Sequence, residues 1–231
     1  MSEILSKEKD GQVFKSIDGN GMENGNMDGI QARLCQLITE DTVFVDCGAH
    51  IGTMSIPVVV KCKPKKAIFI EANTDVVGLL QENCQANLQT LFTVVHAAVC
   101  DKDGEVDFHI IKEKGDSSSM VREDLKKIPP TTVPAITLDT LLENETSPIV
   151  MKVDIEGSEW LMWQGMGKVR PKIKHMVMEW FPAAMPGGWK EQLLAAIHKS
   201  DFHIMLFSGE NITDQKIMEL GKDDLWLRSN I

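Results

Sequence analysis

The segment that most constrains the fold is VFVDCGAHIG, at residues 43–52. Apolar and β-branched residues lead directly into Asp46, and Gly48 and Gly52 then bracket a short turn before a second apolar run begins. This order predicts a strand, a glycine-containing loop and the start of a helix. In such a connection, backbone N–H groups and the first turn of the helix can face a ligand at the carboxyl end of the strand.

A second acid gives this loop a more specific meaning. Glycines bound many tight turns, so the loop alone is also compatible with a plain strand-to-helix connection. However, the strand predicted at 67–70 ends at Glu71, about 20 residues after the loop, where ribose-binding acids stand in nucleotide-binding folds. Together the loop and Glu71 indicate a ligand that carries a ribose.

The order of predicted elements favours one α/β domain. Strands and helices alternate from residue 43 to residue 95, which implies parallel crossovers and a doubly wound, mostly parallel sheet of seven strands flanked by helices. Thr74 or Asp75 is expected to cap the helix after the second strand. Residues 1–27 are polar and rich in Gly and Asn, so they are expected to form a loop or lid before the domain at 28–231. The seven strands are expected at 43–46, 67–70, 92–95, 149–153, 175–178, 202–207 and 225–228.

Composition narrows the classes of partner and the cellular compartment. The 231 residues include 24 Lys and Arg against 34 Asp and Glu, a formal charge of −10, which disfavours a nucleic-acid partner. No stretch reaches the roughly 18 apolar residues of a membrane span, and the opening residues lack an apolar signal core. The five cysteines are odd in number and form no C-x-x-C pair, which argues against disulfides and zinc. A soluble cytoplasmic protein is expected.

Five acids stand at the ends of predicted strands, and their placement indicates a site. Ligands of open α/β sheets lie in the crevice beyond the carboxyl ends of the strands. Acids gathered there repel one another unless a cation, a proton or hydrogen-bond donors intervene. A single acid at a strand end is often only a solvated residue, but the whole set favours a functional cluster. The acids are Asp46, Glu71, Asp154, Glu156 and Glu179.

The chain resembles the FkbM-type S-adenosylmethionine-dependent methyltransferases from about Asn20 to the C-terminus. The motifs that carry the resemblance are VFVDCGAHIGTMSIP, FIEAN, HAAV, ITLDTLL, IVMKVDIEGSEW and HMVMEWFP, in this order, and KVDIEGSE is the most specific. The resemblance implies the Rossmann-like fold of class I methyltransferases. It also implies O-methylation of hydroxyl groups on sugars, glycans or polyketide natural products.

The same resemblance implies a role for each matching residue. Residues around the glycine loop would cradle the amino-acid part of the cofactor, Glu71 would hold the ribose diol, and residues after the third strand would flank the adenine. His50 stands where relatives have glycine or asparagine, which leaves its cofactor contact open, although it can still make one hydrogen bond. The implied cofactor-binding residues are Asp46, Gly48, Ala49, His50, Gly52, Glu71, Ala72, Asn73, Ala97, Ala98 and Asp154.

The candidate catalytic residues are carboxylates near the expected position of the methyl group. Methyl transfer from a sulfonium requires alignment of the two partners and removal of a proton from a weakly acidic alcohol. Asp154, Glu156 and Glu179 are the candidate bases, and Lys152 either pairs with them or forms a purely structural ion pair. A Mg²⁺ ion held by Asp154 and Glu179 is a less favoured alternative, and no metal site is assigned.

Other functions fit the sequence less well. The chain has no tyrosine and its loop lacks the G-x-G-x-x-G spacing, which disfavours a nicotinamide-dependent oxidoreductase. Residues 154–157 read DIEG, where amino-methyltransferases of DNA or RNA typically carry an Asn/Asp-Pro-Pro-aromatic turn. The prediction is therefore O-methylation of a carbohydrate or glycan hydroxyl. A methyltransferase of polyketide-like small molecules and a non-catalytic nucleotide-binding module remain the alternatives.

Overall fold

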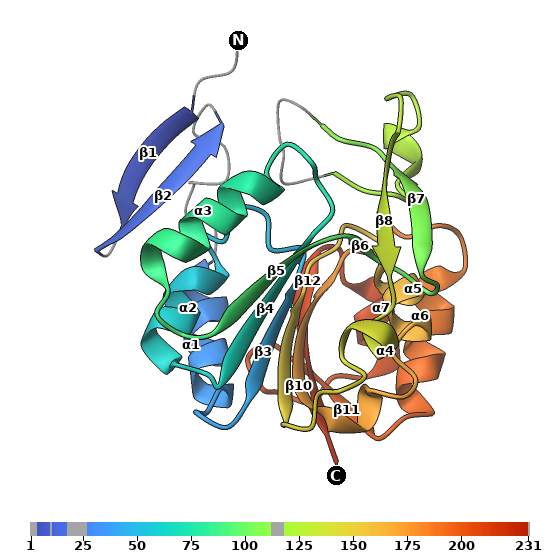
Figure 1. Ribbon diagram of the computed structural model, residues 1–231. Coiled ribbons are helices and arrows are strands. Elements are labelled where there is room, and N and C mark those ends of the chain that lie inside the picture. The colour runs from blue at the N-terminus through green and yellow to red at the C-terminus, as the bar shows by residue number, and fades with distance from the viewer. Residues whose placement is uncertain (1–3, 10, 18–26, 112–117, 231) are drawn as a thin grey trace.

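The computed structural model describes residues 4–9, 11–17, 27–111 and 118–230. Its centre is a seven-stranded sheet in the order β11-β12-β10-β9-β3-β4-β5 (Figure 1). Neighbouring strands are parallel from β10 to β5, and β12 is antiparallel to both of its neighbours. This confirms the predicted doubly wound α/β sheet. The strands are β3 (Val43–Cys47), β4 (Lys66–Glu71), β5 (Phe92–His96), β9 (Ile149–Val153), β10 (Ile173–Trp180), β11 (Phe202–Leu206) and β12 (Asp223–Ser229).

Helices cover both faces of the sheet (Figure 1). Side chains alternate along β3, so that Phe44 packs with helices on one face while Val43 and Val45 pack into the core on the other. Every residue of β3 is buried, as expected for a central parallel strand. One face carries α1 (Met27–Leu37), α2 (Ser55–Cys62) and α3 (Val77–Asn87), and the other carries α4 (Leu138–Leu141), α5 (Glu159–Gln164), α6 (Trp189–His198) and α7 (Asp214–Glu219).

A small three-stranded sheet follows β5 and extends the sheet edge where the ligand crevice is expected. It contains β6 (Ala98–Val99), β7 (Gly104–Phe108) and β8 (Thr131–Ile136) in the order β6-β8-β7. Ala98 and Phe108 pack against Ala72, which directly follows β4. This small sheet therefore stands beside the carboxyl end of β4. Among the described residues, short 3₁₀ turns lie at Glu123–Leu125 and Arg170–Lys172.

The N-terminal segment differs from the expected loop. β1 (Ile4–Lys9) and β2 (Gln12–Ile17) form an antiparallel hairpin. The side-chain amides of Asn83 and Asn87 on α3 hydrogen-bond to the main chain of β2 at Lys15 and Val13. These bonds between distant segments, together with burial of Phe14 in the core, hold a largely polar stretch in regular structure. The Gly- and Asn-rich stretch at 18–26 lies outside the described residues, so a lid there stays a prediction.

The start of α3 also differs from expectation. Its N-cap is Val76, whose side chain makes no capping bond. The side chain of Asn73 instead accepts a hydrogen bond from the N–H of Asp75, so neither Thr74 nor Asp75 caps the helix. Within the described part of the chain, no helix combines the length and apolar character that crossing a membrane requires.

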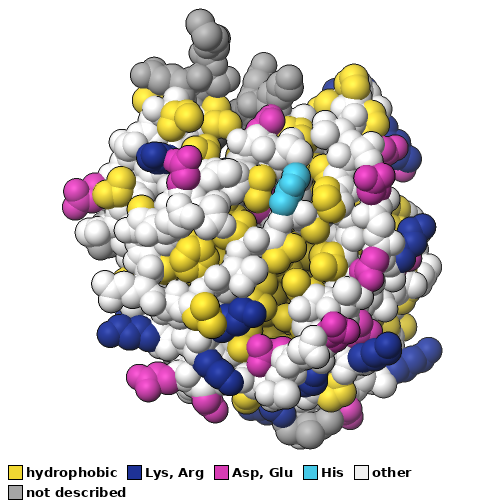
Figure 2. All heavy atoms as spheres, in the orientation of Figure 1, with side chains coloured by type: hydrophobic (Ala, Val, Ile, Leu, Met, Phe, Trp, Pro, Cys, Tyr) yellow, Lys and Arg dark blue, Asp and Glu magenta, His cyan; other side chains and the backbone are white. Residues whose placement is uncertain are grey.

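Figure 2 shows how charge is distributed on the face in the view of Figure 1. Basic and acidic side chains are dispersed around the periphery of that face, and apolar side chains gather along its middle. The middle corresponds to the open edge of the sheet at β5. No continuous basic surface stands out among the described residues on this face.

Candidate functional site

The carboxyl ends of the central strands line a cavity of about 540 Å³. Its walls come from the loop after β3, the residues that follow β4, β5 and β9, the end of β10, and the small sheet. This volume lies within the range of cavities that bury small ligands. The cavity is where the sequence predicts a ligand crevice, because parallel strands place their carboxyl ends at one edge.

The glycine loop is held tightly to the strands on either side of it. The N–H groups of Gly48 and Ala49 both donate to the carbonyl of Ile70, at 3.0 Å each. Gly48 has a φ of +84°, and a Cβ there would lie 1.8 Å from the carbonyl oxygen of Asp154. Only glycine allows this approach. The loop after β3 and the turn after β9 therefore form one continuous wall.

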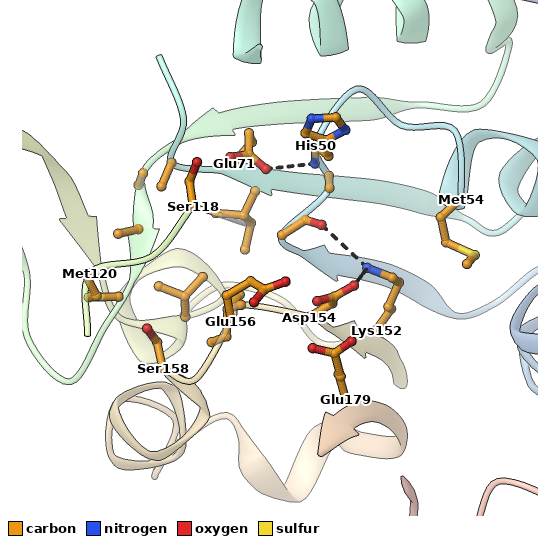
Figure 3. Close-up of a pocket in the computed structure, with 18 of the residues that line it drawn as sticks. His50, Met54, Glu71, Ser118, Met120, Lys152, Asp154, Glu156, Ser158 and Glu179 are labelled. Carbon is orange, nitrogen blue, oxygen red and sulfur yellow. Dashed lines mark hydrogen bonds and ion pairs between the residues drawn. The ribbon is translucent and has the colours of Figure 1, made fainter. Parts of the chain in front are cut away.

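Glu71 is oriented by the backbone on both sides of it. One carboxylate oxygen accepts a hydrogen bond from the N–H of His50 at 2.7 Å (Figure 3). The other accepts from the N–H of Asn73, also at 2.7 Å. Burial raises the pKa of Glu71, and these backbone donors oppose the rise. Each oxygen keeps a further lone pair for a ligand hydroxyl. Glu71 lines the cavity as an oriented acceptor.

Lys152 forms a buried ion pair beneath the cavity. Its Nζ lies 3.2 Å from Asp46 and 3.6 Å from Asp154. Asp46 is completely buried and also accepts a hydrogen bond from the hydroxyl of Ser55. Burial lowers the pKa of Lys152, but the two carboxylates raise it by more, so the net pKa shift is upward. Lys152 therefore acts as a fixed cation in the cavity wall.

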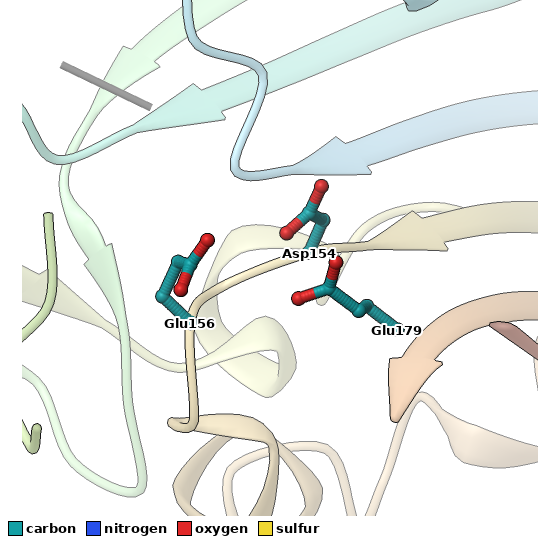
Figure 4. A group of neighbouring side chains, drawn as sticks. All are labelled: Asp154, Glu156 and Glu179. Atoms are coloured by element: carbon teal, nitrogen blue, oxygen red, sulfur yellow. The ribbon is translucent and has the colours of Figure 1, made fainter. Parts of the chain in front are cut away.

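Three carboxylates converge on the other side of Lys152. Oxygens of Asp154, Glu156 and Glu179 all lie within 4.8 Å of one another, and Figure 4 shows them approaching from the turn after β9 and from β10. Glu156 has a φ of +53°, a backbone conformation that side chains rarely adopt. Burial raises the pKa of Glu156, and the charge of Asp154 adds to the rise. Such strain and crowding are typical of functional sites.

Two cations that the sequence did not indicate accompany these acids. Arg122, from the segment between β7 and β8, lies 3.0 Å from Glu156. Lys222, from the turn before β12, lies 2.8 Å from Glu179 and 3.9 Å from Glu156. Burial raises the pKa of Glu179 to about 8, the charge of Asp154 adds to the rise, and Lys222 opposes it.

Comparison with known proteins assigns the family. Residues 46–208 match the methyltransferase FkbM domain. The chain belongs to the FkbM methyltransferase family. This confirms the resemblance seen in the sequence and makes the chain a member of an S-adenosylmethionine-dependent methyltransferase family. No curated protein is similar enough to match it.

Solved structures support the fold of this FkbM-family chain. TYW2 from M. jannaschii in complex with AdoMet is 15% identical, with a TM-score of 0.53, over 98% of this chain and 84% of that chain. The FkbM methyltransferase from Methylobacillus flagellatus KT is 16% identical, with a TM-score of 0.52, over 83% of this chain and 44% of that chain. The M. jannaschii tRNA m1G37 methyltransferase is 11% identical, with a TM-score of 0.50, over 99% of this chain and 57% of that chain. These similarities show the class I methyltransferase fold.

Most of the residues singled out in the sequence lie around the cavity of this FkbM-family fold. Three do not line it within the described structure: Asp46 lies beneath it, Gly52 packs against α2 and α3, and Asn73 orients Glu71 through its backbone. Residues missed in the sequence include Arg122, Lys222 and Asp224, which faces Glu179 across the β10–β12 pairing. The predicted residues that do line the cavity are Gly48, Ala49, His50, Glu71, Ala72, Ala97, Ala98, Lys152, Asp154, Glu156 and Glu179.

Proposed function

We propose that this chain is an S-adenosylmethionine-dependent O-methyltransferase that acts on a hydroxyl group of a sugar or glycan. The observation that carries the proposal is the position of Glu71, whose two oxygens are held by backbone N–H groups at the cavity wall. A carboxylate so oriented suits the two hydroxyls of a ribose. Family membership makes S-adenosylmethionine the expected cofactor.

The cavity residues fit the parts of this cofactor. Glu71 would hold the ribose, Ala97 and Ala98 would flank the adenine, and the loop from Gly48 to His50 would face the amino-acid part. Asp154 and Glu156 would lie next to the transferable methyl group. When bound, the cofactor supplies an activated methyl group on a positively charged sulfur.

Glu179 is the best candidate for the general base. Its pKa of about 8 lies near the pH at which a base is most effective, and it lines the cavity beside Asp154. In the reaction, a bond forms between the acceptor oxygen and the methyl carbon as the carbon–sulfur bond breaks, and the hydroxyl proton passes to the carboxylate. Asp154 and Glu156 would hold neighbouring hydroxyls, and Lys152 would fix Asp154. Mg²⁺ at these acids remains the less favoured arrangement.

The acceptor end of the cavity supports a neutral, hydroxyl-rich acceptor. Asp154, Glu156, Glu179 and Asp224 line this end together with Lys152 and Lys222, and these groups can accept hydrogen bonds from hydroxyls and donate to them. The four carboxyl groups outnumber the two ammonium groups, which disfavours the phosphates of a nucleic acid. The net charge of −10 also disfavours a nucleic-acid acceptor. One structural neighbour is a tRNA m1G37 methyltransferase, but at 11% identity it shares the fold alone.

Calorimetry with S-adenosylmethionine tests the cofactor site. Glu71→Gln removes a charged acceptor, which contributes roughly 1.5–3 kcal/mol per hydrogen bond, so the Kd should rise about 10- to 150-fold. The control is Glu82→Gln, because Glu82 is an exposed residue of α3 that pairs with Lys15. An unchanged Kd for Glu71→Gln would refute the ribose assignment.

Methyl transfer from labelled cofactor to saccharides, lipids and small phenols tests the acceptor class. Label is expected on a saccharide hydroxyl, and Asp154→Ala should lose transfer while it retains cofactor binding. Label only on a polyketide-like phenol would establish the alternative acceptor. Binding without any transfer across the panel would favour a non-catalytic module, and EDTA in a parallel reaction would reveal dependence on Mg²⁺.

A further inference from the structure

Ser158 occupies a helix N-cap without capping the helix. It directly precedes α5, where a serine side chain usually accepts a hydrogen bond from the backbone two or three residues later. Here the side chain makes no such bond, although the residue is only 1% exposed. Among the residues that the structure describes, its Oγ has no hydrogen-bond partner. A buried hydroxyl in this state is costly and calls for a partner.

The surroundings of Ser158 indicate where that partner would come from. Ser158 lines the ligand cavity. Figure 3 shows it on the same side as Met120, away from Met54 and Lys152. Apolar side chains gather on that side, including Phe108 and Met120 of the small sheet. Ser158 therefore borders the apolar end of the cavity, away from Lys152 and its two ion pairs.

We propose that the hydroxyl of Ser158 hydrogen-bonds to the polar edge of the adenine base and so selects adenine at this site. The inference rests on the proposed function, because it takes the apolar end of the cavity as the seat of the base. Apolar walls stabilise the faces of a planar base but do not distinguish one purine from another. Discrimination requires a polar group at the base edge, and a hydroxyl can both donate to and accept from ring nitrogens and amino groups.

A matched pair of serine variants isolates this role. Ser158→Ala removes the hydroxyl at the cavity. Ser16→Ala is the control, because Ser16 on β2 is equally buried and its Oγ also lacks a hydrogen-bond partner among the described residues, yet it does not line the cavity. Thermal unfolding of both variants establishes that each is folded before binding is measured.

The experiment measures the Kd of adenosine, purine riboside, 1-deazaadenosine and 7-deazaadenosine by calorimetry. Ser158→Ala should weaken adenosine binding roughly 3- to 10-fold, the range expected for one neutral hydrogen bond, and Ser16→Ala should leave the Kd unchanged. The effect of Ser158→Ala should disappear for the one analogue that lacks the partner atom.

Two results would overturn the inference while leaving the proposed function intact. One is an unchanged Kd of adenosine in Ser158→Ala, which would mean that the hydroxyl pairs with water or with another molecule. The other is an equal loss for adenosine and all three analogues, which would indicate a general structural effect. Failure of the wild-type protein to bind adenosine or S-adenosylmethionine would instead refute the proposed function, and this inference with it.

Discussion

Lys152→Met is the substitution with the largest expected effect on stability among the ionic residues of the site. Asp46 is fully buried, and Lys152, whose side chain is 7% exposed, lies 3.2 Å from it. The substitution introduces an apolar side chain of similar length, and among the described residues it leaves the buried carboxylate of Asp46 with Ser55 as its side-chain partner. Breaking a buried ion pair in this way costs about 3–5 kcal/mol. That loss is a large share of the roughly 5–15 kcal/mol that stabilises a typical protein.

Urea unfolding monitored by tryptophan fluorescence measures this loss. The double variant Asp46→Asn/Lys152→Met should recover most of the stability, because it removes both charges together. Lys190→Met is the control, since Lys190 is partly exposed and lies 3.9 Å from Glu191, an arrangement expected to contribute less than about 1 kcal/mol. A loss below about 1 kcal/mol for Lys152→Met would show that the ion pair contributes little to stability. A double variant whose loss equals the sum of the two single losses would show that the two charges are not coupled.

Three further predictions concern stability and pH. Gly48→Ala should lower the free energy of unfolding by more than about 3 kcal/mol, because the backbone would be strained and the new Cβ would overlap the carbonyl oxygen of Asp154. Gly78→Ala is the control in the same urea experiment, and it should raise the free energy of unfolding by about 0.5–1 kcal/mol because Gly78 is an open helical position. Burial raises the pKa of Glu159 from 4.5 to about 7, so the contribution of Glu159 to the free energy of unfolding is full below pH 4.5 and is lost as the pH rises through 7. Glu159→Gln should remove this pH dependence, which amounts to about 3 kcal/mol. Parallel profiles of unfolding free energy against pH for the two proteins would contradict the prediction. Lys222→Met should raise the pKa of Glu179 above 8, and Lys222→Arg should restore it. Infrared titration of the carboxylates measures this pKa. An unchanged titration in Lys222→Met would show that Lys222 does not influence Glu179.

The parts of the fold that could be predicted are those determined locally. The alternation before Asp46, the two glycines after it and the acid at the end of the next strand indicate a strand, a loop and a second strand that ends in an acid, without reference to distant residues. The N-terminal hairpin could not be predicted in this way. Its second strand is held by Asn83 and Asn87, which stand far along the chain.

Two cations of the site, Arg122 and Lys222, escaped prediction for the same reason, whereas Lys152 was predicted. Lys222 reaches Glu179 because β12 pairs antiparallel with β10, and Arg122 reaches Glu156 because the small sheet folds back over the turn after β9. Neither residue stands in a motif. The position of Asp46 near a strand end was predicted, but the direction of its side chain was not. That side chain pairs with Lys152 and does not line the cavity.

The balance of charge around Glu179 connects these features. Three carboxylates meet three cationic side chains there, and Glu179 retains a pKa of about 8 because burial and Asp154 outweigh Lys222. A positive charge placed beside this group favours its ionised form. Glu179 would therefore lose its proton when a cationic ligand enters and regain one when that charge disappears. In the proposed O-methyl transfer, loss of charge on sulfur and release of the acceptor proton coincide. The raised pKa would then suit Glu179 to accept that proton at the moment when the neighbouring positive charge is removed.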